Sequence, residues 1–506
     1  MIMKKVLLTS IGGSSAGAKP LATSLLSAIL KSKGHEVVYF DTTFMDLGFP
    51  LDGEVSDSVM QYKKVDWGKY NLVRDKSINA KSVFLNLIKK ERPDLIAASC
   101  MSDMYSHTID FLKIAKDNYD IPIIMGGIHA TTLPDEVIAE DCIDALCVGE
   151  GEEAILEFVD AISGSNITRT DIQNLWIKKN DIVHKNPVRP LKDINKLPFL
   201  DYSIYDPRQF LRPFEGKIIK SGDVQDIRGC PRRCPYCANS VLNELYPIGR
   251  VRFFSPERFV EEMKFLTKTY DLKFFKIFSE DMLLRNVDDF ARLSELYQKE
   301  VNVPFTSHAH PHTVTREKAK LLKKMNCASI SMALESGNYE FRKNILKRDY
   351  TDETYIEKVR ILKEEGIRVA ALNMMGMPYE TKEMIFDTFR LLKKARPSLA
   401  NISMFFPYRG TPLGDTAVKE GYASEEEIKP ARSDMSKTIL KMPQISQKEL
   451  NGIRKMSYFY LHYSEILYPL FQVCYEENIF SRFLLRLLIK LNRFRLFLKN
   501  KVLKFS

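Results

Sequence analysis

The chain lacks the features that mark secreted and membrane-spanning proteins. It has only eight cysteines in 506 residues, too few and too scattered for the disulfide framework of a secreted protein. No window holds about eighteen uninterrupted apolar residues, so no segment is expected to span a membrane. The first residues, MIMKKVLLTSIGG, contain too short an apolar run for a secretory signal. These absences predict a reducing, cytoplasmic setting in which cysteines stay available for metal binding.

Most of the chain also lacks an excess of charge of one sign. The formal net charge is +10, and residues 478–506 alone carry eight basic and no acidic residues. This tail contributes +8 of the +10, which leaves +2 for everything before it. The overall charge therefore says little about the preceding domains. The basic residues of the tail belong to no recognisable nucleic-acid-binding motif, so no nucleic-acid partner is expected.

Short apolar segments alternate with helical ones through residues 1–165, the first of the two or three domains that this length predicts. Apolar strands between helices predict a doubly wound, Rossmann-like parallel sheet that is covered on both faces. Ligands of such α/β sheets bind beyond the carboxyl ends of the strands. The predicted strands are 4–10, 35–41, 94–100, 121–127 and 143–149.

A second alternating series follows a polar linker over residues 166–205. Six strand-like segments with helices between them predict a partial (β/α)6 barrel over 206–425, with its active site at the carboxyl ends of the strands. Residues 426–506 are predicted to form a helical C-terminal region. The six strand-like segments are 225–230, 274–281, 305–310, 328–337, 368–378 and 400–412.

Three cysteines form the one tight cysteine cluster of the sequence. GCPRRCPYCANS places Cys230, Cys234 and Cys237 at i, i+4 and i+7 after a predicted strand. Glycine and prolines keep the segment out of a continuous helix, so a loop can aim three thiolates at one centre. Three ligands suit a 4Fe–4S cluster with one iron left open, and Arg232 and Arg233 would favour deprotonated cysteines. A structural zinc site is the alternative, although it needs a fourth ligand and no second CxxC pair is present.

The CxxxCxxC loop, with Tyr236 before its last cysteine, resembles the signature of the radical S-adenosylmethionine (SAM) superfamily. Three further segments are similar to motifs of this superfamily, in order and at the expected spacing. They are ALESGNYEFRKNILKR (333–348), NMMGMPYET (373–381) and FFPYRGTPL (405–413), which resemble its fourth-strand ESG, its GxPxET and its sixth-strand segments. With the LPFLD connector, the resemblance covers about residues 192–415.

The resemblance implies a 4Fe–4S cluster on the three cysteines, with SAM chelating the open iron. Reduction of the cluster would cleave SAM and yield a 5′-deoxyadenosyl radical. Some of the implied contacts have a structural alternative: Glu280 and Asp281 could cap the next helix, and Gly376 could shape a turn. A carboxylate at the end of an apolar strand is costly unless it is paired. The implied SAM contacts are Tyr236 near the adenine, Glu280 and Asp281 near the amino group, Glu335 and Ser336 near the ribose or methionine part, and Gly376.

Histidines alternate along the third predicted barrel strand. His308 and His310, followed by His312, would place one side of the strand toward the barrel interior. His308 and His310 are therefore candidate catalytic or substrate-facing residues, with packing in the barrel as the structural alternative. A second metal site is disfavoured because no acidic partner lies adjacent.

The N-terminal domain resembles the cobalamin-binding domain of cobalamin-dependent radical SAM enzymes. The similar segments are GGIHAT (126–131), DALCVGEGEEA (144–154) and the segment that begins at Ser99. Domains that supply a histidine to cobalt carry Asp-x-His-x-x-Gly after the first strand, whereas this chain has SIGGSSAGAKP. We expect cobalamin to bind without a protein histidine. A Rossmann-type nucleotide is the alternative, although GGSSAG is neither a GxGxxG nor a Walker pattern. The implied cobalamin contacts are Ser99, Gly126, Gly127, His129 and Gly149.

The C-terminal tail combines a basic stripe with apolar runs. A basic amphipathic helix predicts contact with a membrane surface through residues 478–506. Packing on the barrel with a solvated basic face is an equal alternative. The basic residues that share one helical face are Arg482, Arg486, Lys490 and Arg493, and the apolar residues expected opposite them are Phe480, Leu484, Leu487, Leu488 and Leu491.

These features predict a cytoplasmic, cobalamin-dependent radical SAM C-methyltransferase that is peripheral to a membrane. Its expected partners are a small-molecule or lipid substrate and an electron donor such as flavodoxin or ferredoxin. The alternative reaction is a radical-mediated cyclisation or rearrangement, as in the anaerobic magnesium-protoporphyrin monomethyl ester cyclase, which shares this domain order. A methylthiotransferase is disfavoured because Cys100, Cys142 and Cys147 form no cluster-binding set. The non-enzymatic alternative is a zinc-stabilised binding or membrane-scaffold protein.

Overall fold

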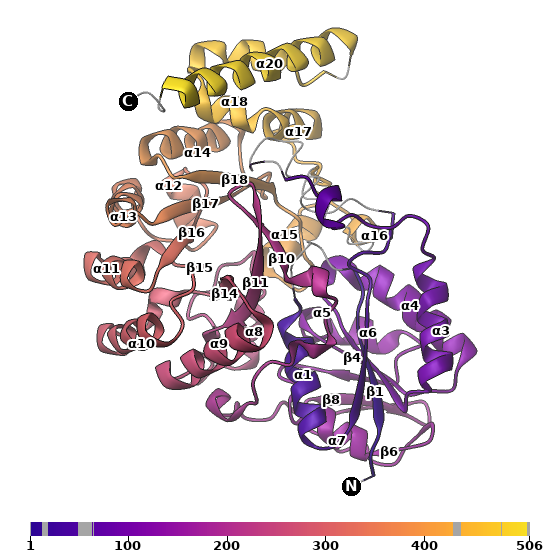
Figure 1. Ribbon diagram of the computed structural model, residues 1–506. Coiled ribbons are helices and arrows are strands. Elements are labelled where there is room, and N and C mark those ends of the chain that lie inside the picture. The colour runs from indigo at the N-terminus through magenta and orange to yellow at the C-terminus, as the bar shows by residue number, and fades with distance from the viewer. Residues whose placement is uncertain are drawn as a thin grey trace.

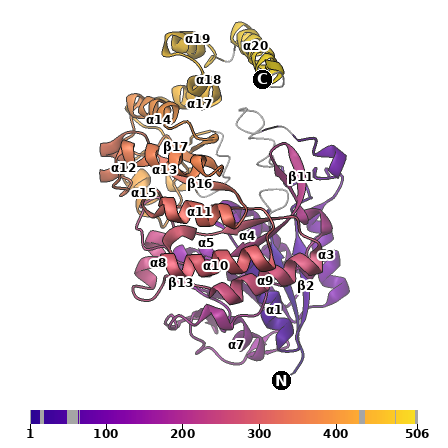
Figure 2. The same ribbon diagram turned by 60° about the vertical axis from the view of Figure 1, so that its left-hand side comes forward.

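A computed structural model describes residues 2–12, 19–48, 63, 65–428, 437–476 and 478–502. The chain forms an N-terminal α/β domain, a half-barrel beside it and a layer of helices at the far end of the half-barrel (Figure 1). Figure 2 shows the same order from another side, with the C-terminal helices remote from the N-terminal domain. Within the described residues, no helix is both long and apolar enough to cross a membrane.

The N-terminal sheet has the strand order β2-β1-β3-β4-β5-β8-β9. Its first five strands pair in parallel, which confirms the predicted doubly wound domain. Alternate residues of β1 enter different cores, Leu7 on one face and Val6 and Leu8 on the other. Burial on both faces explains why these strands are continuous apolar runs. The five strands are β1 (Lys5–Ser10), β2 (Glu36–Asp41), β3 (Leu95–Ser99), β4 (Ile123–Gly126) and β5 (Ala145–Cys147).

Helices connect these strands and cover both faces of the sheet (Figure 1). The side chain of Asn79 caps α3 by accepting a hydrogen bond from Ser82 N, and Pro134 begins α6. The helices of this domain are α1 (Leu21–Ser32), α3 (Ala80–Glu91), α4 (Tyr105–Asn118), α5 (Ile128–Thr132), α6 (Pro134–Ala139) and α7 (Ala154–Asp160), with the short turns η1 (Gly68–Tyr70) and η2 (Ser102–Met104).

The segment predicted as a polar linker over 166–205 is partly structured. Strands β8 (Leu175–Lys179) and β9 (Ile182–Lys185) form an antiparallel hairpin that extends the N-terminal sheet beyond β5. Leu175 and Ile177 are fully buried, whereas Trp176, Lys178 and Lys179 are only partly buried. This short apolar segment, followed by two lysines, is easily mistaken for part of a polar connector. The rest contains the small hairpin β6 (Ile162–Ser163) and β7 (Asn166–Ile167) and the turns η3 (Ile194–Lys196), η4 (Tyr202–Ile204) and η5 (Pro207–Phe210).

The second sheet is a half-barrel of six parallel strands, as predicted, with one antiparallel strand at its edge. The first barrel strand lies earlier than predicted. Residues 217–225 form it, whereas residues 227–228 pair antiparallel with 252–253. Its sequence, KIIKSGDVQ, is too polar to be recognised as a strand. The strands are β10 (Leu211–Phe214), β11 (Lys217–Gln225), β14 (Phe274–Phe278), β15 (Phe305–His308), β16 (Cys327–Glu335), β17 (Arg368–Met375) and β18 (Leu399–Met404), with the short pair β12 (Ile227–Arg228) and β13 (Arg252–Phe253).

The barrel helices cover the outer face of this sheet, and hydroxyl side chains set where they begin. Ser255, Thr351 and Thr381 each accept a hydrogen bond from a backbone N–H of the first turn. Most of these helices lie in a row along the sheet in Figure 1. The helices of this part of the chain are α8 (Asn239–Leu245), α9 (Pro256–Tyr270), α10 (Val287–Glu300), α11 (Arg316–Lys324), α12 (Tyr339–Asn344), α13 (Asp352–Glu364), α14 (Lys382–Ala395), α15 (Pro412–Lys419) and α16 (Glu425–Ile428), with the turns η6 (Met282–Leu284) and η7 (Pro311–Thr313). Of these, α16 lies on the side of the N-terminal domain and not on the outer face (Figure 1).

The C-terminal helices pack against α14 through an aromatic cluster. Tyr460 contacts Phe386 and Phe389, with ring centroids 5.1 and 5.5 Å apart. Ser446 begins this layer with a capping box that Glu449 completes. The layer consists of α17 (Gln447–Lys455), α18 (Ser457–His462), η8 (Glu465–Leu467), α19 (Tyr468–Val473) and α20 (Ile479–Val502).

Candidate cofactor site between the two domains

The cysteine loop follows β12 and is held by backbone contacts from three directions. Gly229 precedes Cys230 at φ +92°, and a Cβ there would lie 2.3 Å from Arg250 O, so only glycine fits. Asn243 donates to the carbonyl of Cys230 at 3.0 Å. The backbone N of Leu413, at the end of the sixth barrel unit, donates to the carbonyl of Pro235 at 2.8 Å. The loop is therefore positioned by both ends of the barrel sequence.

The three thiols lie close enough to influence one another. Burial raises the pKa of Cys237, and the other two cysteines raise it further. Burial also raises the pKa of Cys230, which the adjacent Arg232 opposes. In the part of the chain that the structure describes, no three or more His, Cys, Asp or Glu side chains converge on a single metal ion. A structural zinc ion needs such convergence, whereas each cysteine of a 4Fe–4S cluster binds a different iron.

Three arginines lie near the thiols: Arg232, Arg250 and Arg348. Of these, only Arg232 was predicted from the sequence. Arg348, buried, places Nη1 3.9 Å from Cys234 Sγ. The pKa of Arg250 is lowered by burial, while Cys230 and Cys237 oppose that shift, so its charge also acts on them. Arg233, predicted to take part, is exposed instead.

Tyr236 and Glu335 meet beside the cysteine loop. The Tyr236 hydroxyl donates to Glu335 Oε1 at 3.1 Å, and Arg348 Nη1 donates to the same hydroxyl at 3.3 Å. Burial raises the pKa of Glu335, which Arg348 opposes. Glu335 has φ +66°, an unusual value at the end of β16. The structure thus brings two predicted SAM contacts into one network, at some backbone cost.

Glu280 and Asp281 follow β14 and have different surroundings. The Asp281 carboxylate accepts hydrogen bonds from Arg232 at 3.0 Å, His310 N at 3.2 Å and Thr313 at 2.7 Å. It does not cap the helical turn that follows. Glu280 leaves Oε2 buried with no hydrogen-bond partner among the described residues, and burial raises its pKa to about 7. Glu280 is therefore open to a ligand, whereas Asp281 positions its neighbours.

His308 and His310 do not act as a pair. His310 Nδ1 accepts from His312 N at 3.2 Å, so the neutral ring carries its proton on Nε2, which has no described partner. Burial, with Arg348 and Arg232 nearby, lowers the pKa of His310. His308 lies lower on β15, at the inner face of the sheet, and its pKa is lowered to about 4 by burial. Among the described residues, these histidines belong to no group of three or more His, Cys, Asp or Glu that could hold a metal ion.

Ser336 and Gly376 have structural surroundings. The Ser336 carbonyl accepts from Arg342 at 2.8 Å, and Ser336 is fully buried. Gly376, at φ +77°, donates its N–H to Glu380 at 2.6 Å within the turn after β17. Asn373, which sequence reasoning missed, pairs in register with Glu335 and leaves Oδ1 buried without a described partner. The sequence did contain a signal for this residue, because a polar asparagine stands within an otherwise apolar strand.

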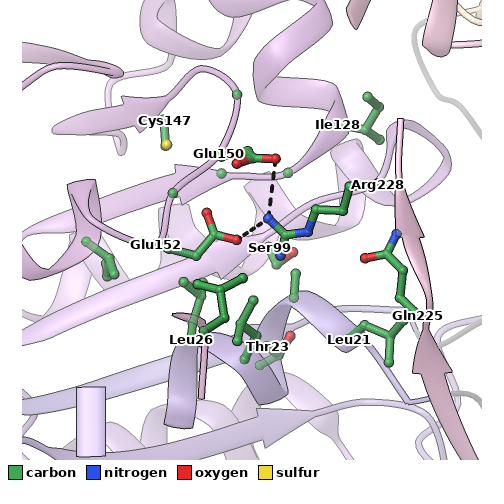
Figure 3. Close-up of a pocket in the computed structure, with 18 of the residues that line it drawn as sticks. Leu21, Thr23, Leu26, Ser99, Ile128, Cys147, Glu150, Glu152, Gln225 and Arg228 are labelled. Carbon is green, nitrogen blue, oxygen red and sulfur yellow. Dashed lines mark ion pairs between the residues drawn. The ribbon is translucent and has the colours of Figure 1, made fainter. Parts of the chain in front are cut away.

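A pocket of about 500 Å³ separates the two domains (Figure 3). The N-terminal domain lines it at the carboxyl ends of its parallel strands, where small residues leave room, and the barrel domain lines it with the start of the cysteine loop. Gly127, at φ +100°, lies against Cys100, and a Cβ there would be 2.5 Å from Cys100 O. The lining residues used below are Ser99, Gly126, Gly127, Gly149, Arg228, Gly229, Tyr246, Arg250 and Glu280.

Ion pairs join the two walls of this pocket. Arg228 of the barrel lies 2.6 Å from Glu152 and 3.3 Å from Glu150, as Figure 3 shows. Tyr246 accepts a hydrogen bond from Glu150 N at 3.1 Å. A Cβ on Gly149 would lie 2.0 Å from the Tyr246 hydroxyl, so glycine here permits the domain contact.

His129 does not line the pocket. Its ring lies against Tyr105, with centroids 4.0 Å apart, and both ring nitrogens are buried without described partners. Burial lowers its pKa to about 4, so it is neutral at pH 7. No histidine is among the described lining residues. Of the loop that replaces Asp-x-His-x-x-Gly, residues 13–18 lie outside the described residues.

The residues present fit the three implied groups. Three adjacent thiols beside three arginines, of which Arg348 is buried, match the chemistry of an anionic iron–sulfur cluster. Unpartnered polar atoms of Glu280, His310 and Asn373 remain for SAM. The pocket has glycines at the strand ends, where a large planar ring can approach the backbone, and it offers cobalt no histidine.

The comparisons agree with this arrangement. The sequence model of the B12 binding domain matches residues 73–159, and that of the Radical SAM superfamily matches residues 224–392. The chain is 26% identical over 395 residues to an uncharacterized methyltransferase of Pyrococcus horikoshii, a match that covers 76% of this chain and 83% of the relative. It is 25% identical over 335 residues to the anaerobic magnesium-protoporphyrin IX monomethyl ester cyclase of Cereibacter sphaeroides, a match that covers 64% of this chain and 53% of the cyclase.

Two solved structures share the fold. The radical SAM methyltransferase TsrM of Kitasatospora setae, solved with cobalamin and a 4Fe–4S cluster, is 18% identical, with a TM-score of 0.63 over 84% of this chain and 79% of that one. The cobalamin-dependent SAM radical enzyme OxsB, solved with aqua-cobalamin and SAM, is 14% identical, with a TM-score of 0.64 over 97% of this chain and 71% of that one. The chain therefore belongs to the radical SAM superfamily, as an enzyme with an N-terminal B12-binding domain that works with a 4Fe–4S cluster, SAM and cobalamin.

Proposed function

We propose that this enzyme is a cobalamin-dependent radical SAM methyltransferase that methylates an unactivated carbon. One geometric feature supports the proposal most strongly. The pocket beyond the strand ends of the B12-binding domain reaches Gly229 and Glu280 of the barrel, next to the cysteine loop. Cobalamin and SAM would therefore face the same space, as transfer of a methyl group to a substrate radical requires.

We assign the cluster to Cys230, Cys234 and Cys237, with one iron open to SAM. Glu280 would accept the SAM ammonium group, because its carboxylate is buried and open to a ligand. Tyr236 and Glu335 would hold the nucleoside part. We propose that Asp281, Ser336 and Gly376 position these residues through the contacts described above and do not themselves touch SAM.

We assign the cobalamin contacts to Ser99, Gly126, Gly127 and Gly149, all of which line the pocket. His129 would act only by packing under the strand ends, because its ring lies against Tyr105. The interdomain ion pairs of Arg228 would close the pocket on one side and limit access of water to it. Exclusion of water protects a radical reaction from side reactions.

When bound, the cofactors supply the chemistry: reductive cleavage of SAM generates a radical that abstracts hydrogen, and cobalamin carries the methyl group. The protein positions both and shapes the electrostatics around them. Arg232, Arg250 and Arg348 would stabilise the negative charge that the cluster gains on reduction. The electron donor would be a small redox protein such as a flavodoxin or a ferredoxin.

The test is transfer of a labelled methyl group. Reconstituted enzyme with cobalamin, reductant and SAM carrying a trideuterated methyl group is incubated with a metabolite extract of its source organism, and products are analysed by mass spectrometry. A product that gains the labelled methyl group, absent without cobalamin, supports the proposal. Cleavage of SAM with a product that lacks the label would support a cyclase or rearrangement enzyme instead, the reaction type that the protoporphyrin relative suggests.

We further propose that α20 places the enzyme on a membrane surface. Ten of the twenty exposed large hydrophobic side chains among the described residues lie between Ile466 and Phe494. Five of the six on α20 form one outward stripe with spacings of three, four, four and three residues, typical of a helical face. The stripe consists of Phe480, Phe483, Leu487, Leu491 and Phe494.

Basic residues flank this apolar stripe. Arg486 and Lys490 are exposed beside it, and α20 contains no acidic residue. Leu484 and Leu488, predicted to share the apolar face, pack inward against the C-terminal core instead. The helix thus has a packed face, an exposed apolar face and a basic face. An apolar stripe beside cationic side chains suits the interface of a membrane that contains anionic lipids.

A further inference from the structure

The inner face of the half-barrel carries a row of polar side chains below the cofactor end. Val224, Ile277 and Phe305 pack into the core beneath the helices, so their neighbours along each strand point to the other, inner face. In the parallel register, Asp223 pairs with Lys276, and Lys276 pairs with Thr306. His308 lies two residues beyond Thr306 on the same face of β15. Asp223, Lys276 and His308 are therefore neighbours across three adjacent strands.

The one carboxylate of this group is already fully engaged. Arg212 Nη2 donates to both oxygens of Asp223, at 2.8 and 2.9 Å. Lys19 N donates to Asp223 Oδ2 at 2.9 Å, and Lys19 Nζ donates to the carbonyls of Gln209 and Ser221, each at 2.9 Å. Both charged groups beside Asp223 thus have hydrogen-bond partners within the fold.

Lys276 differs from these residues. Its ammonium group makes no hydrogen bond or ion pair with the described residues, and its nearest aromatic contact is the Phe278 ring, 4.6 Å from the centroid. Burial lowers the pKa of Lys276 to about 8, Arg212 lowers it as well, and Asp223 opposes the shift. Beside it, Nδ1 of His308 is buried without a described partner. This site thus combines a half-buried cation with a buried ring nitrogen, neither of which has a hydrogen-bond partner among the described residues.

Asp223 already accepts hydrogen bonds from Arg212 and Lys19, and no carboxylate among the described residues pairs with Lys276. A half-buried charge without a partner is costly, and a fold retains one mainly where a ligand supplies the missing charge. Lys276 is a cation, so the ligand group that completes this site is an anion.

We propose that Lys276 and His308 bind the anionic group, a carboxylate or a phosphate, of the substrate that is methylated. This inference rests on the proposed function, because it takes the barrel interior as the substrate site. Lys276 lies on β14 and Glu280 lies just beyond the end of this strand, four residues later, which corresponds to about 13 Å of extended chain. The substrate would therefore be an elongated acid whose charged end lies deep in the barrel and whose reacting carbon lies near the strand ends.

The anion subsite is tested by thermal unfolding of the enzyme loaded with cluster, cobalamin and SAM, without substrate. The probes are sodium phosphate and sodium acetate, compared with sodium chloride at equal ionic strength. We expect phosphate or acetate to raise the Tm of the wild-type protein by about 2–4 °C. The anion with the larger effect identifies the group, a phosphate ester or a carboxylic acid.

Lys276→Met and Lys276→Gln are the test variants. We expect each to raise the Tm in chloride, since an unpaired half-buried charge is removed, and to abolish the response to phosphate and acetate. Lys268→Met removes the same charge from the exposed surface of α9 and should keep the full response. Equal responses in wild type and both Lys276 variants, or no response in wild type, would overturn the proposal. These Tm measurements involve no methyl transfer. Their result can therefore be interpreted even if the labelling experiment contradicts the proposed function.

Discussion

Nη1 of Arg348 lies 3.9 Å from Sγ of Cys234, with both residues buried at the carboxyl end of the barrel. The same guanidinium donates to the carbonyl of Ala333 at 2.7 Å, which fixes its position. A fixed positive charge next to a cluster ligand stabilises the more negative, reduced state of the cluster. Arg348 therefore connects the strand-four segment with the electron-accepting step of the reaction.

Replacement of this arginine should make the cluster harder to reduce. For Arg348→Met we expect the midpoint potential to fall by about 60 mV, which for one electron is a tenfold change or about 1.4 kcal/mol. Redox titration followed by electron paramagnetic resonance measures it. Arg233→Met, on the same loop but exposed, is the control and should leave the potential unchanged. A shift of equal size in both variants would mean that the proximity of Arg348 to Cys234 has no special role.

Loss of one loop cysteine should abolish the cluster without unfolding the protein. We expect Cys234→Ser to lose most of its bound iron and sulfide and all cleavage of SAM to 5′-deoxyadenosine. Cys327→Ser provides the control, because Cys327 is buried in β16 away from the loop. It should keep its iron content, at a stability cost of about 1–3 kcal/mol for a buried hydroxyl. Full iron content in Cys234→Ser would contradict the assignment.

Glu280 should make SAM binding depend on pH. Burial raises its pKa to about 7, so below pH 7 the carboxyl group is protonated in the SAM-free enzyme and cannot attract an ammonium group. The KM for SAM should therefore rise as pH falls below 7. In Glu280→Gln we expect a KM about tenfold higher, a loss of about 1.4 kcal/mol, with no such pH dependence.

Asp281→Asn is the matched comparison for this residue. Asp281 bonds Arg232 and Thr313, so its replacement should lower the Tm and weaken the cluster loop. Its pH profile for SAM should keep the wild-type shape. If the pH dependence disappears in Asp281→Asn and persists in Glu280→Gln, the roles of the two residues are reversed.

The exposed face of α20 should bind anionic vesicles. We expect the enzyme to sediment with vesicles containing phosphatidylglycerol and not with pure phosphatidylcholine, and the binding to weaken as salt screens the basic residues. Phe483→Glu with Leu487→Glu should reduce binding at least about tenfold, since burial of each side chain is worth about 1.5–3 kcal/mol. Ile248→Glu, at an exposed site on the barrel, should bind normally. Concentration-dependent dimerisation that the α20 variants remove, without vesicle binding, would show that a second copy covers this face.

Local patterns in the sequence were sufficient to predict most of the strands and the cysteine loop. The parallel strands of the N-terminal domain are buried on both faces and appear as apolar runs, whereas strands of the half-barrel such as β17 bury alternate residues beneath the helices. The hairpin β8–β9 was missed because its short apolar segment runs into two lysines. Strand β11 was missed because its buried residues include the polar Ser221 and Asp223. Burial of these polar groups depends on partners that are distant in sequence, Lys19 and Arg212 among them.

The site residues divide in the same way. The spacing of Cys230, Cys234 and Cys237 indicated their chemistry directly. Sequence alone did not distinguish Glu280 from Asp281, because the difference lies in the contacts that Asp281 makes with Arg232 and Thr313. Tyr246 and Arg250 were not identified because their roles exist only after the two domains meet and the loop closes.

The co-products of turnover test the central claim most directly. Enzyme loaded with cluster and cobalamin is supplied with SAM, reductant and the metabolite extract that yields product, and 5′-deoxyadenosine and S-adenosylhomocysteine are quantified together. Radical methylation through cobalamin predicts equal amounts of the two co-products, because one SAM supplies the radical and another the methyl group. Both co-products should fall with the methylated product when cobalamin is omitted. Formation of 5′-deoxyadenosine without S-adenosylhomocysteine, at a rate that does not depend on cobalamin, would contradict the account.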